Sequence, residues 1–593
     1  MKSGDAEHFL SQPGTVVARL PGDGLEWGIF EDPLEVLTAF SCDGIKRVLD
    51  LTGIRAQEGR ALAGFISYEA APGFDRVHKV KAAPGIMPLI WFGVYERFRK
   101  FEFSGECSPE VPEISPEIDS DKYRELLAKV KKYIYEGDIY QANLTYRMRG
   151  KMLSDAEALF LSLFSKHPAP YSAFVNTGEF KIVSNSPELF IETGGGVIKS
   201  IPMKGTSPRS PFPDEDAELA RTLAVDPKNN AENLMITDMV RNDLGRICVP
   251  GTVRTGPLFH VDTYATLHQM VSTVRGELRE NLSLYEIFKA VFPAASITGA
   301  PKIRAMEVIE ELEKSPRCIY TGTIGCVMPG GTASCFNVAI RTLAVHGGVC
   351  ELGVGGGIVA DSEPASEWAE SLLKSRFLFN AGEPDFKVLE TMLLDNGVFA
   401  FPEEHIRRAG KSQLYFGRGF DESILREKLH FLANEKGRGL FRVRMLLEPD
   451  GGVELQCQEL KSASWPSSEL QIKISDKRTS SADVFLYHKT TNRFLYDNEF
   501  AAALAEGFDE VIFLNEKGEV TEGAISNIFI LNDSKWYTPE LRCGLLPGIW
   551  RKKMIAELSA VETKISLSDL KNAEKIILCN SVRNSSPVSG IRF

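Results

Sequence analysis

The alternation of apolar and polar positions predicts short strands first and a helix later. Residues 1 to about 104 carry short β-like apolar runs, at 63–68 and 89–94. From Tyr123 onward the apolar residues recur at helical spacing. Mixed strand and helix patterns then continue to about residue 380. The helix that begins at Tyr123 is predicted from Leu126, Leu127, Val130 and Ile134.

Two breaks in this pattern suggest domain boundaries. A chain of 593 residues is too long for one hydrophobic core, so several domains are expected. Residues 107–121 are rich in Pro and Glu, which predicts a linker or an exposed connection. A second break lies at 381–385. We therefore predict an N-terminal lobe at 1–118, a core domain at 119–380, and one or two small domains at 385–593.

Composition and charge narrow the class of protein. The chain is 43% hydrophobic and 25% charged, which is ordinary for a globular protein, and its net charge of −12 argues against nucleic-acid binding. No apolar run is long enough to cross a bilayer, and acidic residues stand where an export signal would need apolar ones. The ten cysteines form no CxxC pair and are expected to be reduced. Together these features predict a cytoplasmic protein without a membrane segment.

The middle of the chain carries a series of motifs in a specific order. Most single lysines in loops are simply solvated, so Lys204 is a candidate functional residue only because of the motifs around it. The motifs lie at 137–145, 186–190, 201–206, 231–246, 296–302, 355–362 and 367–370. In this order they resemble the chorismate-utilising enzymes, which include anthranilate synthase, isochorismate synthase and aminodeoxychorismate synthase component I. The resemblance covers about 120–378 and implies an α+β fold, with two packed antiparallel sheets and helices outside.

The resemblance assigns two carboxylates to a magnesium ion. Chorismate carries two carboxylates, so its site needs cations, and Mg²⁺ is usually held by one or two carboxylates with water and substrate completing the shell. By resemblance these ligands are Glu232 and Glu370. Glu367 lies three residues before Glu370 on a probable helix and shares its face. It is either a partner of the ligand shell or a surface charge, and both interpretations stay open.

Further residues match positions that contact the substrate in this family. Gly355 and Gly357 would let backbone N–H groups approach a carboxylate closely. Arg341 matches an arginine that clamps a substrate carboxylate with its forked donors. Tyr320 and His268 match other contact positions. The alternatives are a core aromatic for Tyr320 and a hydrogen-bonded core histidine for His268.

Lys204 separates the candidate activities within the family. Anthranilate synthases tend to have a small residue at this position, whereas aminodeoxychorismate synthases have lysine in Pro-Ile-Lys-Gly-Thr, which here reads Pro-Met-Lys-Gly-Thr. By resemblance the amine attacks ring carbon 2 covalently as the carbon-4 hydroxyl leaves, and Glu188 protonates that hydroxyl. Ammonia then enters at carbon 4. Because the sequence shows no glutaminase signature, the resemblance implies a separate glutamine amidotransferase subunit.

The last segment carries a second ordered set of motifs. They lie at 389–392, 405–408, 487–493, 520–529 and 544–549. They resemble the fold-type IV pyridoxal 5'-phosphate enzymes, a family that includes branched-chain and D-amino-acid aminotransferases and aminodeoxychorismate lyase. The resemblance implies an α+β module of two subdomains. It places Lys489 at the Schiff-base position and Glu522 opposite the pyridine nitrogen of the cofactor.

Three more positions match the cofactor's phosphate site. Arg408 fits the phosphate-binding arginine, although the adjoining Arg407 is a rival. Ile549, after Gly548, would offer backbone N–H groups at a helix start. Ser581 would add a hydroxyl, with an ordinary surface serine as an equally good interpretation.

Adjacency of the two modules favours a lyase over an aminotransferase. The amine that the first module makes at carbon 4 is a substrate for the second, which would release pyruvate and leave 4-aminobenzoate. One alternative is an anthranilate synthase fused to an aminotransferase, against which Lys204 argues. The other is a non-catalytic scaffold that recruits an amidotransferase, against which the complete set of site residues argues. Type IV enzymes commonly form dimers, so a homodimer through this module is a further expectation.

Overall fold

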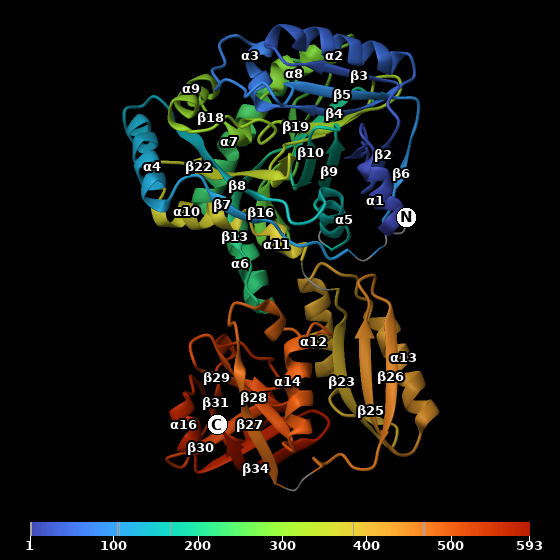
Figure 1. Cartoon of the computed structure of the whole chain (residues 1–593), viewed down its shortest axis with the longest axis vertical. Coiled ribbons are helices and arrows are strands. Elements are labelled where there is room, and N and C mark those ends of the chain that lie inside the picture. Colours follow the sequence, from blue (N-terminus) through green and yellow to red (C-terminus); the bar gives the residue numbers. More distant parts are fainter. Residues whose placement is uncertain (1–2, 104, 106, 167, 383–384, 467–468) are drawn as a thin grey trace. The chain divides into compact units, whose positions relative to one another are not determined.

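The computed structural model describes residues 3–103, 105, 107–166, 168–382, 385–466 and 469–593. The chain forms two compact units (Figure 1). The first unit contains 1–209 and 218–383, and the second contains 210–217 and 384–593. Each unit is described below on its own.

Two large antiparallel sheets and one small sheet form the frame of the first unit. The first large sheet runs in the order β18 (Gly299–Ala300), β8 (Gln141–Lys151), β22 (Val349–Ile358), β21 (Thr342–His346), β10 (Lys181–Ser186), β9 (Tyr171–Asn176), β1 (Val16–Arg19), β2 (Trp27–Phe30) and β6 (Phe98–Phe101), with β7 (Glu113–Pro116) also paired to β8. The second runs β14 (Arg254–Thr255), β17 (Val274–Glu277), β12 (Val197–Ile201), β11 (Leu189–Gly194), β20 (Ser334–Asn337), β19 (Thr323–Val327), β4 (Ala61–Ile66), β5 (Ile90–Tyr95) and β3 (Glu35–Ala39). The small sheet is β13 (Met203–Pro208), β16 (Leu267–Val271) and β15 (His260–Thr263).

The two large sheets pack against each other through a shared apolar core. Phe30 and Ile182 from the first sheet and Phe65 and Ile324 from the second belong to one buried cluster. Every residue of β4 and β5 is buried, which explains why both read as unbroken apolar runs in the sequence. Further clusters bury the outer faces beneath helices. The predicted fold of two antiparallel sheets with helices outside is confirmed.

Helices of the first unit cover the outer faces of the sheets. On the first sheet lie α1 (Ser3–Ser11), α4 (Ser120–Tyr135), α5 (Ala156–Lys166), α9 (Lys302–Leu312), α10 (Pro364–Leu373) and α11 (Phe377–Asn380). On the second lie α2 (Cys42–Gln57), α3 (Ala71–Phe74), α7 (Pro227–Gly245) and α8 (Leu284–Val291). Helix α6 (Pro213–Val225) precedes α7. Helix α4 confirms the helix predicted from the spacing of apolar residues, and the Asp119 side chain caps it by accepting from Lys122 N at 2.8 Å.

One sequence expectation changes in this unit. The stretch 107–121 is more than a connection, because Glu113–Pro116 forms β7 and Ser120 already begins α4. Pairing with β8 supplies the hydrogen bonds that the local composition does not predict. Strands from the predicted lobe (1–118) and from the predicted core (119–380) share both large sheets, and both stretches lie in one compact unit.

Two sheets also frame the second unit. The smaller runs β24 (Val398–Phe399), β23 (Val388–Asp395), β25 (Leu440–Leu447) and β26 (Val453–Leu460). The larger runs β29 (Val520–Gly523), β28 (Glu510–Asn515), β27 (Leu470–Thr479), β34 (Asn584–Arg592), β33 (Lys575–Asn580), β30 (Asn527–Asn532), β31 (Lys535–Pro539) and β32 (Val561–Thr563). Each sheet has its own buried cluster, which gives the module two subdomains as predicted.

Helices of the second unit pack on these sheets. They are α12 (Pro402–Tyr415) and α13 (Glu422–Lys436) on the smaller sheet, and α14 (Phe494–Ala505), α15 (Ile549–Leu558) and α16 (Leu567–Lys571) on the larger one. Among the residues described in either unit, no helix combines the length and the apolar character needed to cross a membrane.

Two candidate active sites

A cavity of about 360 Å³ lies in the first unit where strand ends meet helices α7 and α10. It collects side chains that lie far apart in sequence. The predicted residues that line it are Glu188, Lys204, Glu232, Tyr320, Arg341, Gly355, Gly357, Glu367 and Glu370. The fold therefore brings together nearly all of the residues expected to act on chorismate.

Local backbone geometry presents Lys204 to this cavity. The pairing of β13 with β16 shifts register between Met203 and Thr206, and Gly205 takes a φ of +99° that other residues rarely adopt. Across the cavity, a Cβ added to Gly357 would lie only 1.9 Å from the Lys204 Nζ. This glycine therefore leaves the space that the amine occupies. Removal from water lowers the pKa of Lys204, while the negative charge of Glu232 acts in the opposite direction.

Glu188 is a buried carboxyl at the other side of the cavity. It is 3% exposed and accepts a hydrogen bond from the Ser296 hydroxyl at 2.5 Å. Burial raises its pKa to about 7, although the bonds from Ser296 and from the Met203 backbone act to lower it. A carboxyl that keeps its proton near neutral pH can serve as a general acid.

The two predicted metal ligands come from different helices. Glu232 lies on α7 and Glu370 on α10, and both line the cavity. Burial raises the pKa of Glu232. Glu370 lies 2.8 Å from the Lys374 ammonium, and this cation keeps the Glu370 pKa below its usual value despite burial. Lys374 also donates to the Gly355 carbonyl at 2.9 Å.

These carboxylates fit a magnesium ion. Two hard oxygen donors facing one polar cavity match Mg²⁺, which usually keeps several waters and takes one or two carboxylates. Within the described ranges, no three His, Cys, Asp or Glu side chains gather as a ligand group. Glu367 lines the cavity and accepts from the Ser362 hydroxyl at 2.7 Å, so it is not a plain surface charge.

Arg341 and Tyr320 form a further part of the wall of the first cavity. Arg341 has a φ of +50°, a left-handed conformation that non-glycine residues adopt only under local constraint. Its guanidinium lies 5.3 Å from the Tyr264 ring, and burial lowers its pKa to about 10. The Tyr320 ring fills the space above Gly353, where an added Cβ would lie 2.1 Å away, and the Arg147 guanidinium stands 5.0 Å from it.

His268 is the one predicted contact residue that the cavity lining, as described, does not include. It lies on β16 and is 1% exposed. Its Nδ1 stands 2.9 Å from the Thr263 hydroxyl. This is the hydrogen-bonded core environment that formed the alternative interpretation, and a contact with substrate stays a prediction.

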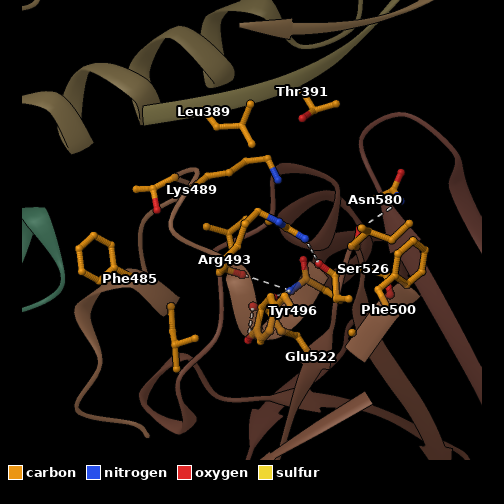
Figure 2. Close-up of a pocket in the computed structure, with 18 of the residues that line it drawn as sticks. Leu389, Thr391, Phe485, Lys489, Arg493, Tyr496, Phe500, Glu522, Ser526 and Asn580 are labelled. Atoms are coloured by element: carbon orange, nitrogen blue, oxygen red, sulfur yellow. Dashed lines mark hydrogen bonds between the residues drawn. The ribbon is translucent and has the colours of Figure 1, made fainter. Parts of the chain in front are cut away.

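The second unit holds a cavity of about 670 Å³ between its two sheets. The predicted cofactor residues all line it, namely Arg408, Lys489, Glu522, Ile549 and Ser581. Figure 2 shows Lys489 reaching into this space, with Leu389 and Thr391 on one side and Arg493, Tyr496 and Glu522 on the other.

Lys489 lies in the connection between β27 and α14 of the larger subdomain, and this connection contacts β23 of the smaller one. The Leu389 N–H donates to the Lys489 carbonyl at 2.8 Å, and Thr490 bridges to Val388 of β23. Burial, followed by the nearby charges of Arg493 and Arg408, lowers the pKa of Lys489 to about 7. A large fraction of this amine is therefore uncharged at neutral pH, as attack on a carbonyl requires.

Glu522 is held by two side chains at the floor of the cavity. Asn527 Nδ2 donates to one carboxyl oxygen at 3.0 Å, and the Tyr496 hydroxyl donates to the other at 3.2 Å. The carboxyl is 5% exposed, and burial raises its pKa to about 8. Such a group can share a proton with a pyridine nitrogen, which fits pyridoxal phosphate.

The residues that were predicted to bind the phosphate of the cofactor also fit it. Arg408 forms a two-pronged pair with Glu390, with N–O distances of 2.8 and 2.7 Å, and donates to the Pro547 carbonyl at 3.0 Å. Arg407 is exposed, so only Arg408 of the two lines the cavity. Helix α15 begins at Ile549 after Gly548, where an added Cβ would lie 2.0 Å from the Asn527 side chain. An open helix N-terminus of this kind suits an anionic group.

Sequence reasoning did not identify several residues that shape these sites. Lys374 lies four residues after Glu370, a helical spacing that could have revealed the pair. Ser296 and Glu390 both lie inside motifs whose roles were not assigned. Tyr496 and Asn527 contact Glu522 from α14 and β30, and only the fold shows these contacts.

Comparison with known proteins agrees with both family resemblances. Residues 105–380 match the chorismate binding enzymes, and 387–591 match the amino-transferases of class IV. Aminodeoxychorismate synthase component 1 of Escherichia coli is 34% identical over 420 residues, which cover 63% of this chain and 90% of that protein. Anthranilate synthase component 1 of Streptomyces coelicolor is 39% identical over 261 residues, covering 44% of this chain and 51% of that protein.

One solved structure supports the fold of the first unit. Anthranilate synthase component I from Streptococcus pneumoniae superposes with a TM-score of 0.53 at 23% identity, and the match covers 62% of this chain and 93% of that one. The chain spans only about a third of the length of the first curated relatives that it matches. By its match to nearly all of the Escherichia coli protein, the chain belongs to the chorismate binding enzymes that include aminodeoxychorismate synthase component 1, and a class IV amino-transferase domain follows.

Proposed function

We propose that the chain makes 4-aminobenzoate from chorismate in two steps, one in each unit. The first unit would aminate chorismate at ring carbon 4. The second would remove pyruvate from the resulting 4-amino-4-deoxychorismate. The observation that carries this proposal is Lys204, a lysine with lowered pKa in a cavity that also holds two carboxylates fit for Mg²⁺.

In the first step Lys204 acts as a nucleophile. Its neutral amine attacks ring carbon 2, both double bonds of the ring diene shift, and the bond from carbon 4 to its hydroxyl breaks. Glu188 donates its proton to that hydroxyl, which leaves as water. Ammonia then bonds to carbon 4, both double bonds shift back, the lysine leaves, and the added nitrogen loses a proton. Magnesium, when bound by Glu232 and Glu370, would neutralise substrate carboxylate charge.

In the second step Lys489 acts as a base at carbon 4. It holds the cofactor first and then removes the proton from carbon 4. The bond between carbon 3 and the enolpyruvyl oxygen breaks, the ring becomes aromatic, and the enol takes up a proton to give pyruvate. Pyridoxal phosphate supplies the electron sink when bound. Glu522 would hold a proton for the ring nitrogen, and Arg408 with the start of α15 would hold the phosphate.

Two partners belong to the proposal. Ammonia would come from a separate glutamine amidotransferase, which fits the name component 1 carried by the Escherichia coli relative. The second unit would pair with its copy in a homodimer. Both are tested by mixing purified chain with such a subunit and by measuring its mass in solution.

A product analysis tests the proposed function directly. Purified chain with chorismate, Mg²⁺, pyridoxal phosphate and an ammonium salt should yield 4-aminobenzoate and pyruvate in equal amounts. Glutamine in place of ammonium should yield neither. Anthranilate as the main product would instead favour the rival activity, which the similarity to the Streptomyces coelicolor protein keeps in view. No turnover in the folded, cofactor-loaded chain would favour a scaffold.

A further inference from the structure

The cavity of the second unit is lined by an unusual number of arginines. They come from both sheets and from the loops between them, and they are Arg408, Arg442, Arg444, Arg478, Arg493 and Arg583. The proposed function uses only Arg408, at the phosphate. The charge of the others is therefore unexplained by the cofactor alone.

These arginines fall into two groups by their partners. Arg408 pairs with Glu390, and Arg493 pairs with Asp497 at 2.8 Å. Within the described part of the chain, the other four form no ion pair with a carboxylate, namely Arg442, Arg444, Arg478 and Arg583; Arg478 donates to the Ser475 carbonyl at 2.9 Å. Arg442 donates to the Gln458 side-chain carbonyl at 2.6 Å, and the Arg583 guanidinium lies 5.4 Å from the Trp465 ring; these contacts leave the positive charges uncompensated.

Three of these four arginines, Arg442, Arg444 and Arg583, are neighbours in the cavity wall. Arg442 and Arg444 lie two residues apart on β25 and so point to the same face. The partner of Arg444 across the ladder is Thr391 of β23, which faces the cavity beside Lys489 in Figure 2. Burial lowers the pKa of Arg442, and the charges of Arg444 and Arg583 lower it further, which shows that the three are neighbours.

A bound anion would stabilise this cluster of positive charges. Three half-buried cations at short range repel one another, and the Nε of Arg442 is buried without a hydrogen-bond partner. A carboxylate would satisfy the free donors and offset the repulsion, since forked guanidinium groups match its two oxygens. The substrate of the proposed lyase step brings two carboxylates, and the paired Arg408 already serves the phosphate.

We propose that Arg442, Arg444 and Arg583 form a carboxylate subsite that binds the acidic groups of the lyase substrate and orients its amine toward Lys489. The inference rests on the proposed function and specifies how its second site selects a substrate. The subsite would favour a cyclic amine that carries carboxylates at a distance from the nitrogen. A neutral amine of the same shape would bind weakly.

Binding of a matched pair of ligands tests the subsite. The cofactor-loaded chain is titrated with 4-aminobenzoate and with 4-aminobenzamide, which has the same shape without the charge. Calorimetry should show the acid binding at least about tenfold more tightly than the amide at low salt, with the gap narrowing as salt rises. In Arg444→Met and Arg583→Met this preference should disappear. Arg438→Met, an exposed arginine just before β25, is the matched control and should keep it.

Kinetics of the lyase half-reaction provide the second measurement. With supplied 4-amino-4-deoxychorismate, each of the two variants should raise KM at least about tenfold while kcat changes only a few-fold, because ground-state binding is lost. The cofactor spectrum and the mass in solution serve to check folding and assembly. Unchanged KM and unchanged acid preference, with turnover intact, would overturn the subsite and leave the proposed function standing. A changed mass with unchanged KM would also overturn it, because the arginines would then serve a subunit contact.

Failure of the proposed function gives a different result. The wild-type chain would then show no lyase turnover, yet it would still prefer 4-aminobenzoate over the amide, and Arg444→Met would abolish that preference. The carboxylate subsite would in that case remain, as part of a site with another reaction.

Discussion

The two cavities each centre on a buried lysine, but they surround it with opposite charge. Lys204 faces the carboxylates Glu232, Glu367 and Glu370, whose charge favours the ammonium form against the effect of burial. Around Lys489 the strongest charged neighbours are Arg493 and Arg408, which act in the same direction as burial and bring its pKa to about 7. The nearest charges therefore oppose the effect of burial at Lys204 and add to it at Lys489.

The difference suits the different chemistry proposed for each site. The first cavity gathers acidic groups because a divalent cation would lie between them and a dicarboxylate substrate. The second gathers arginines, which suits the anionic cofactor and the anionic substrate that we propose for it. In the first, the charge of Glu232 opposes the effect of burial on the Lys204 pKa, and a bound Mg²⁺ would offset that charge. In the second, the charges of the arginines favour the neutral form of the Lys489 amine even without a ligand.

Removing each lysine gives the largest expected effect and separates the two sites. Lys204→Ala should slow amination by at least a thousand-fold, about 4 kcal/mol of transition-state stabilisation, and leave the protein yellow with cofactor. Lys489→Ala should do the reverse, so that 4-amino-4-deoxychorismate accumulates from chorismate. Product analysis by mass spectrometry distinguishes the two. The exposed lysines Lys151 and Lys477 provide control variants.

Mixing the two inactive variants sharpens the comparison further. If the sites act independently, the mixture should again make 4-aminobenzoate through released intermediate. With each half-reaction verified, a mixture that stays inactive would show that the intermediate cannot pass between chains. The two cavities would then have to be treated as one catalytic system.

The acidic character of the first cavity is tested at Glu232. Glu232→Gln removes one of two proposed ligand charges, and we expect Mg²⁺ to bind at least about 100-fold more weakly and amination to stop. Calorimetric titration with Mg²⁺ measures this directly. The lyase half-reaction should continue, with or without EDTA. Asp238→Asn, an exposed change on the same helix, is the control; amination that is indifferent to EDTA would remove magnesium from the first site.

The order of motifs was enough to predict the folds of both units and most of the residues that meet in each cavity. Lys204, Glu232 and Glu370 could be found because each lies in a local pattern that resembles known enzymes. The backbone conformations that orient these side chains toward the cavity could not be predicted from the motifs. The register shift before Thr206 depends on pairing with β16, which lies more than sixty residues away in the sequence.

The roles that the sequence did not predict depend on contacts that form only in the folded chain. Ser296 lies 108 residues from the Glu188 carboxyl that it contacts, and Gly357 is even farther from the Lys204 amine for which it leaves room. The glycine was interpreted as a backbone anion site, whereas the steric role emerges only from the structure. The arginine cluster was missed for a similar reason, since Arg583 joins Arg442 and Arg444 from another sheet.

That steric role gives a smaller and more specific prediction for the first cavity. Gly357→Ala places a methyl group where the Lys204 amine lies, so the amine must move by an ångström or more. We expect amination to slow by roughly 10- to 100-fold, since misplacement on this scale has such costs. Gly356→Ala is a close control, because its Cβ would meet nothing nearer than 3.4 Å. Equal rates for the two variants would show that the lysine does not act from this position.

The smallest expected effect concerns the proton on Glu188. The Ser296 hydroxyl stabilises the charged carboxylate, so Ser296→Ala should raise the Glu188 pKa above its value of about 7. One hydrogen bond of about 1 kcal/mol corresponds to a shift of about 0.7 pH units. As a general acid, Glu188 acts only while protonated, so amination should decline as pH rises through this pKa, and the variant's decline should begin at higher pH. The pH profile of kcat/KM for ammonia-dependent amination measures it, and Glu188→Gln should remove the decline together with most activity. If the decline occurred at the same pH in Ser296→Ala as in the wild type, another group would supply the proton. The first cavity would then lack the general acid that we compare with Lys489, the base of the second cavity.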